Sequence, residues 1–358
     1  MDLSDAIRTQ AAACGRLGSP MYDILLSRVA DDVEGAGVSA ALLAGHESDP
    51  GPSGLALRLM GSVHRLVLER RAPELAAYFP SVGGRFEAGG CWDALRRLFA
   101  DEPAAVTEWL DRPPQTNEVG RASALFGGAL QLPWRWPIRL FEIGSSGGLN
   151  LNADVFEYVD EAGRHFGVDH SPVLLAPAWR GRQLAAWSPE FLERVGSDLR
   201  HVDASTAEGR LTLSAYVWPD QAARWRRLRG GLAVARRRPV EVLTATARDF
   251  VASISLRAGY TTLLWHSVMW QYLDPDEQRD VTASCEALGA VATAETPFAW
   301  LFLEPWRRTP GSEHEFLVIL QTWPTGERRI LGTSKGHGST RPEGRGKVER
   351  HRSTKGAR

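Results

Sequence analysis

The chain has 358 residues, of which 43% are hydrophobic and 24% are charged, and its formal net charge at pH 7 is −1. This length is typical of about two domains, and the composition is typical of a globular protein rather than a disordered one. A net charge so near zero argues against nucleic acid or a membrane surface as the partner of the whole protein. The first ten residues are polar, and no apolar run reaches the roughly 20 residues of a membrane span, so we expect a cytoplasmic protein.

Residues 1–130 are predicted to form an all-helical N-terminal region. Apolar residues recur about every 3.6 positions in residues 21–30 and 55–68. Clusters of proline and glycine at residues 46–54 and 79–90 separate the helical stretches.

Metal ligation is disfavoured by the spacing of the usual ligands. The three cysteines include no Cys-x-x-Cys pair, which argues against a disulfide framework and a cysteine-rich zinc site. His165 and His170 lie five residues apart with Asp169 between them, which is not the i, i+4 spacing of a helical metal pair. We therefore expect no metal.

Residues 116–121 read T-N-E-V-G-R and are predicted to begin a helix that runs to Leu130. Asn117 and Arg121 are four residues apart and would lie on one face of that helix, where they could contact a substrate. The alternative is a helix cap with Thr116 as the N-cap residue. The sequence favours neither interpretation.

Residues 131–333 are predicted to form an α/β domain with a doubly wound, mostly parallel sheet. Short apolar runs alternate with helical stretches at residues 221–235 and 275–288, and this alternation is typical of strands joined by helices. The last two strands would form an antiparallel hairpin at the sheet edge. The predicted strands are residues 140–143, 173–175, 240–244, 261–265, 300–303 and 316–321.

The most informative segment is R-L-F-E-I-G-S-S-G-G-L-N, residues 139–150. It predicts a strand with a carboxylate, Glu142, near its end, then a tight turn and the start of a helix. Such a turn brings bare backbone N–H groups to a ligand at the positive end of the helix. The alternative is a turn without a ligand, but a carboxylate at a buried strand end costs free energy unless something pairs with it. The residues predicted to wrap a ligand are Gly144, Ser145, Ser146, Gly147 and Gly148.

The same turn also fits Gly-x-Ser-x-Gly, the nucleophile elbow of α/β-hydrolases, with Ser146 as nucleophile and the late His337 as the triad histidine. An elbow normally follows several strands, whereas the chain before Ser146 is predicted to be mainly helical. In addition, no acid between Ser146 and His337 stands at a clear strand end. The hydrolase interpretation is therefore the weaker one.

Residues 261–273 read T-T-L-L-W-H-S-V-M-W-Q-Y-L, a buried strand that runs into polar and aromatic residues. In a doubly wound sheet this junction would face the same cleft as the glycine loop. Because imidazole titrates near neutral pH, His266 could then be a general base, and Trp265 and Tyr272 could contact substrate. The alternative is a histidine satisfied by hydrogen bonds among core aromatic rings, which is the commoner role of a lone histidine.

Two basic segments are predicted to be solvated. Residues 218–238 hold seven arginines, which favour the wet face of an amphipathic helix over a phosphate site. Residues 334–358 hold eight lysines and arginines against two glutamates, a net charge of +6. This tail has too little apolar surface to offset the entropy cost of ordering and is predicted to be disordered. A basic arm for nucleic acid is the less favoured alternative.

Together, T-N-E-V-G-R, E-I-G-S-S-G-G-L-N, V-W-P-D-Q-A-A-R-W-R-R-L, W-H-S-V-M-W-Q-Y-L and a late H-G resemble a bacterial family known as a domain of unknown function, DUF2332, from about residue 20 to residue 338. The family offers no established activity to carry over. The glycine loop is also similar to the cofactor loop of class I S-adenosylmethionine-dependent methyltransferases, which has an acidic residue and glycines at alternate positions; Ser146 stands at the middle glycine.

This second resemblance implies a Rossmann-like, methyltransferase-type sheet that binds S-adenosylmethionine. It makes Asp198 and Asp203 the candidates for contacts with the ribose hydroxyls, displaced by an insertion of roughly 30 residues. Glu142 would orient the loop or meet the amino group of the cofactor.

We therefore expect a methyltransferase that acts on a small or medium-sized acceptor, with His266 as base and with Asn117 and Arg121 in contact with the acceptor. Catalysis of such a transfer consists mainly of placing the acceptor in line with the sulfonium. A non-catalytic ligand-binding or regulatory protein on the same fold is the first alternative, and a serine hydrolase that uses Ser146 is the second. The sequence predicts no membrane partner and does not indicate an oligomeric state.

Overall fold

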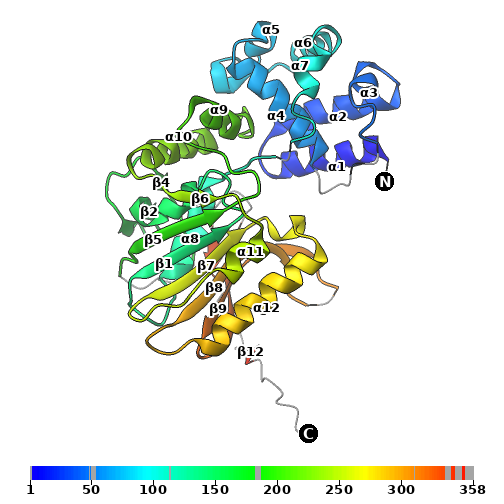
Figure 1. Ribbon diagram of the computed structural model, residues 1–358. Coiled ribbons are helices and arrows are strands. Elements are labelled where there is room, and N and C mark those ends of the chain that lie inside the picture. The colour runs from blue at the N-terminus through cyan, green and yellow to red at the C-terminus, as the bar shows by residue number, and fades with distance from the viewer. Residues whose placement is uncertain are drawn as a thin grey trace. The chain divides into compact units, whose positions relative to one another are not determined.

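The computed structural model describes residues 2–47, 49, 54–112, 114–181, 187–309, 311–334, 340–342 and 349–350 (Figure 1). The chain forms two compact units. The first consists of Met1–Thr116 and Thr206–Arg226, and the second of Asn117–Ser205 and Arg227–Arg358. This division differs from the predicted one, with its boundaries at residues 130 and 333, because the chain leaves the first unit earlier and returns to it once.

The first unit contains only helices, turns and loops among its described residues. Its helices bury apolar positions that the 3.6-residue period marks, such as Leu25. Buried contacts hold the returning segment: Ser19 Oγ donates to Asp220 (2.7 Å), and His64 Nδ1 lies 3.1 Å from the carbonyl oxygen of Ala215. The helices are α1 (Leu3–Arg16), α2 (Pro20–Glu34), α3 (Val38–Leu42), α4 (Leu55–Leu68), α5 (Pro73–Ala76), η2 (Pro80–Val82), α6 (Ala88–Asp101), α7 (Pro103–Thr107) and α9 (Ala207–Ala215), and α10 (Ala222–Arg237) continues from this unit into the second.

The second unit is an α/β structure built on a nine-stranded sheet of order β11-β10-β9-β8-β7-β1-β5-β6, with β12 paired to β10. Strands β6, β5, β1, β7 and β8 are parallel, and β9 to β12 extend the sheet with antiparallel pairs. The strands are β1 (Ile138–Ile143), β5 (Phe191–Ser197), β6 (Glu241–Leu243), β7 (Thr261–Ser267), β8 (Phe298–Arg307), β9 (His314–Trp323), β10 (Glu327–Ser334), β11 (Thr340–Pro342) and β12 (Glu349–Arg350).

Most of the predicted strands lie in this sheet, and the expected hairpin is the antiparallel pair of β8 and β9. The prediction missed β5, whose sequence F-L-E-R-V-G-S is interrupted by charges. The structure explains those charges, since Glu193 of β5 pairs with Arg139 of β1, with Nε and the carboxylate 2.6 Å apart. Residues 173–175 were predicted to be a strand of this sheet, and that placement is wrong. The strand found there, β4 (Leu174–Leu175), belongs to a second, smaller sheet.

Helices cover both faces of the large sheet (Figure 1). Side chains alternate between the faces along each strand. Phe298, Trp300 and Phe302 of β8 share one core with residues of α11 (Ala247–Ala252) and α12 (Pro275–Val291). The opposite face meets α8 (Ala122–Ala129), where Gly128 packs directly on Leu301. The sheet is therefore buried on both sides, as parallel sheets are.

The insertion between β1 and β5 forms the smaller sheet, of order β3-β2-β4, from β2 (Glu157–Val159), β3 (His165–Gly167) and β4. An aromatic stack anchors it to α8. The ring centroids of Phe126 and Tyr158 lie 4.4 Å apart, and those of Tyr158 and Trp179 lie 5.3 Å apart. This sheet accounts for the long separation between β1 and the second parallel strand of the unit.

The C-terminal tail, predicted to be disordered over residues 334–358, contributes β11 and β12 in its described part. Both pair with β10, because an edge strand offers unpaired backbone groups to any neighbouring segment. The remaining tail residues, including His337, lie outside the described residues. Across the residues that the structure does describe, no helix has both the length and the apolar character needed to cross a bilayer.

The packing of α12 on β9 gives a test of the fold. A Cβ atom on Gly289 would approach the indole nitrogen of Trp323 to 2.4 Å. Alanine normally stabilises a helix interior by roughly 0.5–1 kcal/mol relative to glycine. Here overpacking should outweigh that gain, so we expect Gly289→Ala to lower the free energy of unfolding by about 1–3 kcal/mol.

Urea-induced unfolding measures the change. Glu286→Ala, at an exposed position of the same helix, is the control and should alter stability by no more than about 0.5 kcal/mol. A more stable Gly289→Ala variant would contradict the contact between α12 and β9.

Candidate functional site

Strand β1 stands at the point where the strand order of the sheet reverses. The chain passes from β1 to its neighbour β5 on one side and later to its neighbour β7 on the other. In open α/β sheets, ligands bind beyond the carboxyl ends of the strands at this point. The glycine loop follows β1 and therefore occupies this position.

The loop is shaped by left-handed backbone conformations at Gly144 (φ 66°), Ser146 (φ 51°) and Gly148 (φ 65°). Left-handed backbone is uncommon for a residue with a side chain, so Ser146 marks a strained turn. The helix predicted to start after the turn is the short, kinked 3-10 helix η4 (Leu149–Val155).

The expectation that the loop presents bare N–H groups is wrong for four of its amides. Ser145 N–H donates to Ser197 O (3.1 Å), and Gly148 N–H donates to Ser145 O (2.8 Å). Ser146 N–H donates to Asp198 Oδ2 (3.0 Å). Leu149 N–H donates to the Asn117 side chain (2.9 Å). Protein acceptors therefore satisfy these groups before any ligand arrives.

The glycines are also needed for packing. A Cβ on Gly144 would lie 2.8 Å from Met269 Cγ, and one on Gly148 would lie 2.8 Å from a methyl group of Val240. Met269 comes from the loop after β7. The loops after β1 and β7 are thus packed against each other, and a substitution of Gly144 would disturb the fold as well as any ligand.

Glu142 of β1 is buried, with 2% of its surface exposed. Its Oε1 accepts a hydrogen bond from the indole N–H of Trp265 (3.1 Å), and its Oε2 has no donor among the described residues. Burial raises the pKa of Glu142 to about 8, against the opposing effects of the Trp265 hydrogen bond and the Arg121 charge. Trp265, predicted to contact substrate, supports this carboxyl instead in the structure.

The T-N-E-V-G-R segment lies against the same loops. Residues Val119–Arg121 form the 3-10 helix η3, capped by the side chain of Glu118, so Asn117 and Arg121 do not share one helix face as predicted. They nevertheless reach the site, since Asn117 accepts from Leu149 N–H and Arg121 donates to Ser267 O (3.1 Å). One segment thus contacts the loops after β1 and β7.

The two acids predicted for the ribose both follow β5. Asp198 accepts from the backbone N–H groups of Ser146 and Arg200 (2.9 Å to the latter). Asp203 is exposed and accepts from the backbone and hydroxyl of Ser205 (2.8 and 2.6 Å). The first of these acids is therefore held against the glycine loop.

His266 is buried on β7, and its Nδ1 lies 2.8 Å from Glu304 Oε1. It shares the α11/α12 face with Leu264, whereas Trp265 and Glu142 point to the α8 face. The junction after β7 does reach the glycine loop, as predicted, but the side chain of His266 points to the other face of the sheet. The residue of this segment that contacts the glycine loop is Met269, which packs against Gly144. Tyr272, the last residue of η5 (Trp270–Tyr272), is 58% exposed.

Glu304 is the residue that sequence reasoning missed. It ends a buried apolar run on β8, F-A-W-L-F-L-E, as Glu142 stands near the end of one on β1. A carboxylate in such a place was the available signal, since burial requires a partner. Val268, which precedes Met269 in the loop after β7, has φ 52°, a rare conformation for a β-branched residue. Strain is therefore present on both loops of the site.

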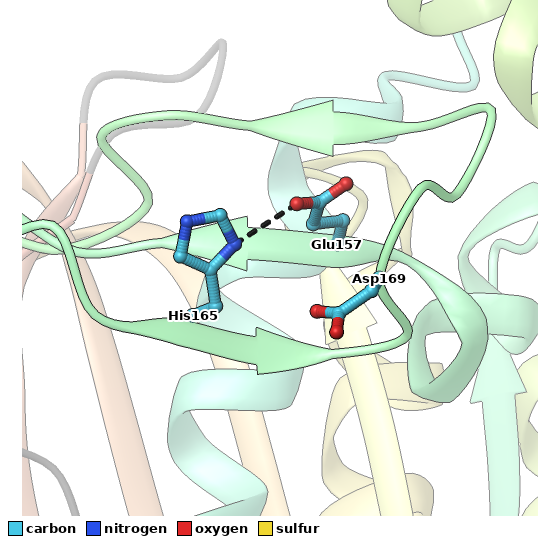
Figure 2. Close-up of side chains that lie close together, drawn as sticks. All are labelled: Glu157, His165 and Asp169. Atoms are coloured by element: carbon cyan, nitrogen blue, oxygen red, sulfur yellow. Dashed lines mark hydrogen bonds and ion pairs between the residues drawn. The ribbon is translucent and has the colours of Figure 1, made fainter.

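Figure 2 shows a separate group, Glu157, His165 and Asp169, on the smaller sheet, with potential ligand atoms within 4.8 Å of one another. One imidazole and two carboxylates can hold a divalent cation. However, Glu157 already accepts from His165 Nδ1 (2.9 Å) and from His170 N–H (3.0 Å), and Asp169 is exposed. These hydrogen bonds account for the geometry, and we assign no ion to the group.

The protonation of Glu142 can be tested through stability. An unfolded glutamate titrates near pH ~4.3. Between there and pH 8 the folded chain keeps a proton that the unfolded chain releases, so this group makes the free energy of unfolding fall as pH rises, by up to about 1.4 kcal/mol per pH unit.

Glu142→Gln keeps an oxygen that can accept from Trp265 and removes the titration. We expect the variant to gain stability relative to the wild type progressively from about pH 5 to about pH 8, as measured by urea unfolding. Parallel pH profiles of the two proteins would show that Glu142 is ionised in the folded chain.

The chain matches the model of a family described as "Uncharacterized protein conserved in bacteria (DUF2332)" over residues 4–341. No curated protein matches the sequence. The matched region includes the T-N-E-V-G-R segment, the glycine loop and the strands that carry His266 and Glu304. The chain belongs to the DUF2332 family of uncharacterised bacterial proteins.

Proposed function

We propose that this protein binds S-adenosylmethionine at the carboxyl edge of β1 and β5 and transfers its methyl group to a small or medium-sized acceptor in the cytoplasm. The observation that carries the proposal is the place of the glycine loop. Numbered along the chain, the parallel strands have the order third-second-first-fourth-fifth, and the loop follows the first. This is the order of a Rossmann-like sheet, whose ligand lies at the reversal.

The polar groups of this site suit several parts of S-adenosylmethionine. Asp198, directly after the second parallel strand, and Asp203 would bind the ribose hydroxyls. The loop from Gly144 to Gly148, with Ser145, Ser146 and Gly147, would enclose the methionine part. Glu142 Oε2 is buried and without a donor among the described residues, and an ammonium group beside it would favour the ionised carboxylate that can accept its hydrogen bond.

Binding at this loop requires Met269 to move away from Gly144. Methionine has three rotatable side-chain bonds and repacks at small cost, so it suits a position that a ligand displaces. The loop amides that already donate within the protein would not have to change partners.

When bound, the cofactor supplies an electrophilic methyl group, and the work of the protein is to place the acceptor in line with it. In this proposal Asn117, Arg121 and Tyr272 orient the acceptor, and Trp265 holds the carboxyl of Glu142. No base is assigned, because the side chain of His266 lies on the opposite face of the sheet. The same site without turnover would make the protein a ligand-binding regulator.

Thermal unfolding with and without S-adenosylmethionine and S-adenosylhomocysteine tests the proposal. At 100 times its dissociation constant a ligand stabilises the native state by about 2.7 kcal/mol, which raises the melting temperature by roughly 5 °C or more. No shift with either compound would contradict the proposal.

Asp203→Asn should weaken binding of either compound by about tenfold or more, because a hydrogen bond to a charged group contributes roughly 1.5–3 kcal/mol. The matched control is Glu286→Gln, at an exposed position on α12, which should leave affinity unchanged. Equal loss in both variants would point to a general charge effect.

A second candidate function, serine hydrolysis, is favoured by one observation. Ser146 has φ 51° in a Gly-x-Ser-x-Gly turn after a strand, and the nucleophile of an α/β-hydrolase sits on a strained turn of this kind. His337, the proposed triad partner, lies outside the described residues. The side chain of His266 projects from the face of the sheet opposite to that of Glu142.

A fluorophosphonate probe separates the two functions, because it reacts covalently only with an activated serine. We expect no labelling, which would be detected by mass spectrometry of the intact protein. Labelling that Ser146→Ala abolishes would establish the hydrolase and exclude the methyltransferase.

A further inference from the structure

The glycine loop is buried except at its first residue. Ser145, Ser146, Gly147 and Gly148 are buried, whereas Gly144 is partly exposed. A molecule that reaches the loop from solvent therefore meets Gly144 first. Because glycine has no side chain, the space above its Cα atom is available to a neighbouring residue or to a ligand.

The side chain of Met269 fills this space. The three atoms nearest to a Cβ on Gly144 would be Cγ, Cβ and Cε of Met269, at 2.8, 2.9 and 3.3 Å. Met269 is itself partly exposed, so its side chain lies at the surface, between Gly144 and solvent. It thus covers the one point at which the glycine loop is open.

The backbone of Met269 is held on both sides. Its N–H donates to Glu304 Oε1 (3.1 Å), and its carbonyl oxygen accepts from Tyr272 N–H (2.9 Å). The preceding amide, of Val268, donates to Leu303 O (2.9 Å). The side chain can move by rotation about its own bonds, whereas movement of the backbone would cost these hydrogen bonds.

We propose that Met269 is a gate that controls access to the glycine loop and acts by rotation of its side chain alone. The identity of the ligand rests on the proposed function. The side chain covers Gly144 in the free protein and swings toward solvent when the methionine part of the cofactor binds. The gate works because methionine is unbranched: its single γ atom occupies one of three staggered positions and leaves two empty.

Branching at Cβ would obstruct this movement. Isoleucine has two γ atoms, which fill two of the three staggered positions, and its first side-chain torsion is stiff. Leucine contains the same atoms but has only one γ atom, so it can clear Gly144 as methionine does. The two residues therefore differ at this position in shape and not in composition.

Three variants test the gate through binding of S-adenosylhomocysteine, measured by isothermal titration calorimetry. We expect Met269→Leu to bind like the wild type. Met269→Ile should bind roughly tenfold more weakly, since the branched side chain must leave its preferred rotamer or overpack the ligand. Met269→Ala, which has no γ atom, should bind at least as tightly as Met269→Leu. Equal affinities of Met269→Leu and Met269→Ile would overturn the proposal.

A second measurement needs no ligand. The chain has four methionines, and labelling of their methyl groups with 13C gives each one a signal. Met21 and Met60 are fully buried, and Met269→Leu identifies the signal of residue 269. We expect the Met269 methyl group to average over rotamers and to be broadened by a soluble nitroxide that leaves Met21 and Met60 unaffected. A single rotamer shielded from the nitroxide would overturn the proposal.

The two measurements separate the gate from the proposed function. Addition of S-adenosylhomocysteine should shift the Met269 methyl signal, and binding without a shift would overturn the gate and leave the methyltransferase intact. Binding to Met269→Ala but not to the wild type would support both, with the gate closed in the free protein. If no variant binds the compound while the Met269 methyl group is mobile and exposed, the gate is supported and only the methyltransferase is contradicted.

Discussion

One buried carboxylate oxygen links the carboxyl ends of three neighbouring strands. Glu304 Oε1, on β8, fixes the imidazole of β7 and the amides of the loop that follows β7. That loop carries Met269 onto Gly144, directly after β1. Each buried donor left without an acceptor costs about 1–3 kcal/mol, so an apolar residue at position 304 would disturb all three strands. The arrangement of the candidate site depends on this one contact.

The pattern of apolar residues predicted much of the fold, because most strands of the second unit are buried on both faces and therefore appear in the sequence as continuous apolar runs. It failed at β5, where Glu193 is stabilised by Arg139 on a strand more than 50 residues away in sequence. It failed again at residues 173–175, where an apolar run belongs to an inserted sheet. Such pairings are properties of the folded chain, and local patterns do not contain them.

The site could be predicted as a set of segments and not as a geometry. Glycines and acids at strand ends identified the loop after β1, the acid after β5 and the histidine on β7. The sequence could not reveal that Glu142 and His266 project from opposite faces, since the face follows from strand register. Nor could it show that the loop glycines accommodate protein side chains, which requires knowledge of what packs on them.

The order in which the chain visits its two units has a consequence for biosynthesis. Residues 206–226 complete the first unit, although a large part of the second unit precedes them. Until the ribosome has released that segment, Ser19 and His64 lack the partners that Asp220 and Ala215 provide. The N-terminal helices therefore emerge first and finish folding late, and a proteolytic fragment ending at Thr116 would lack part of its own core.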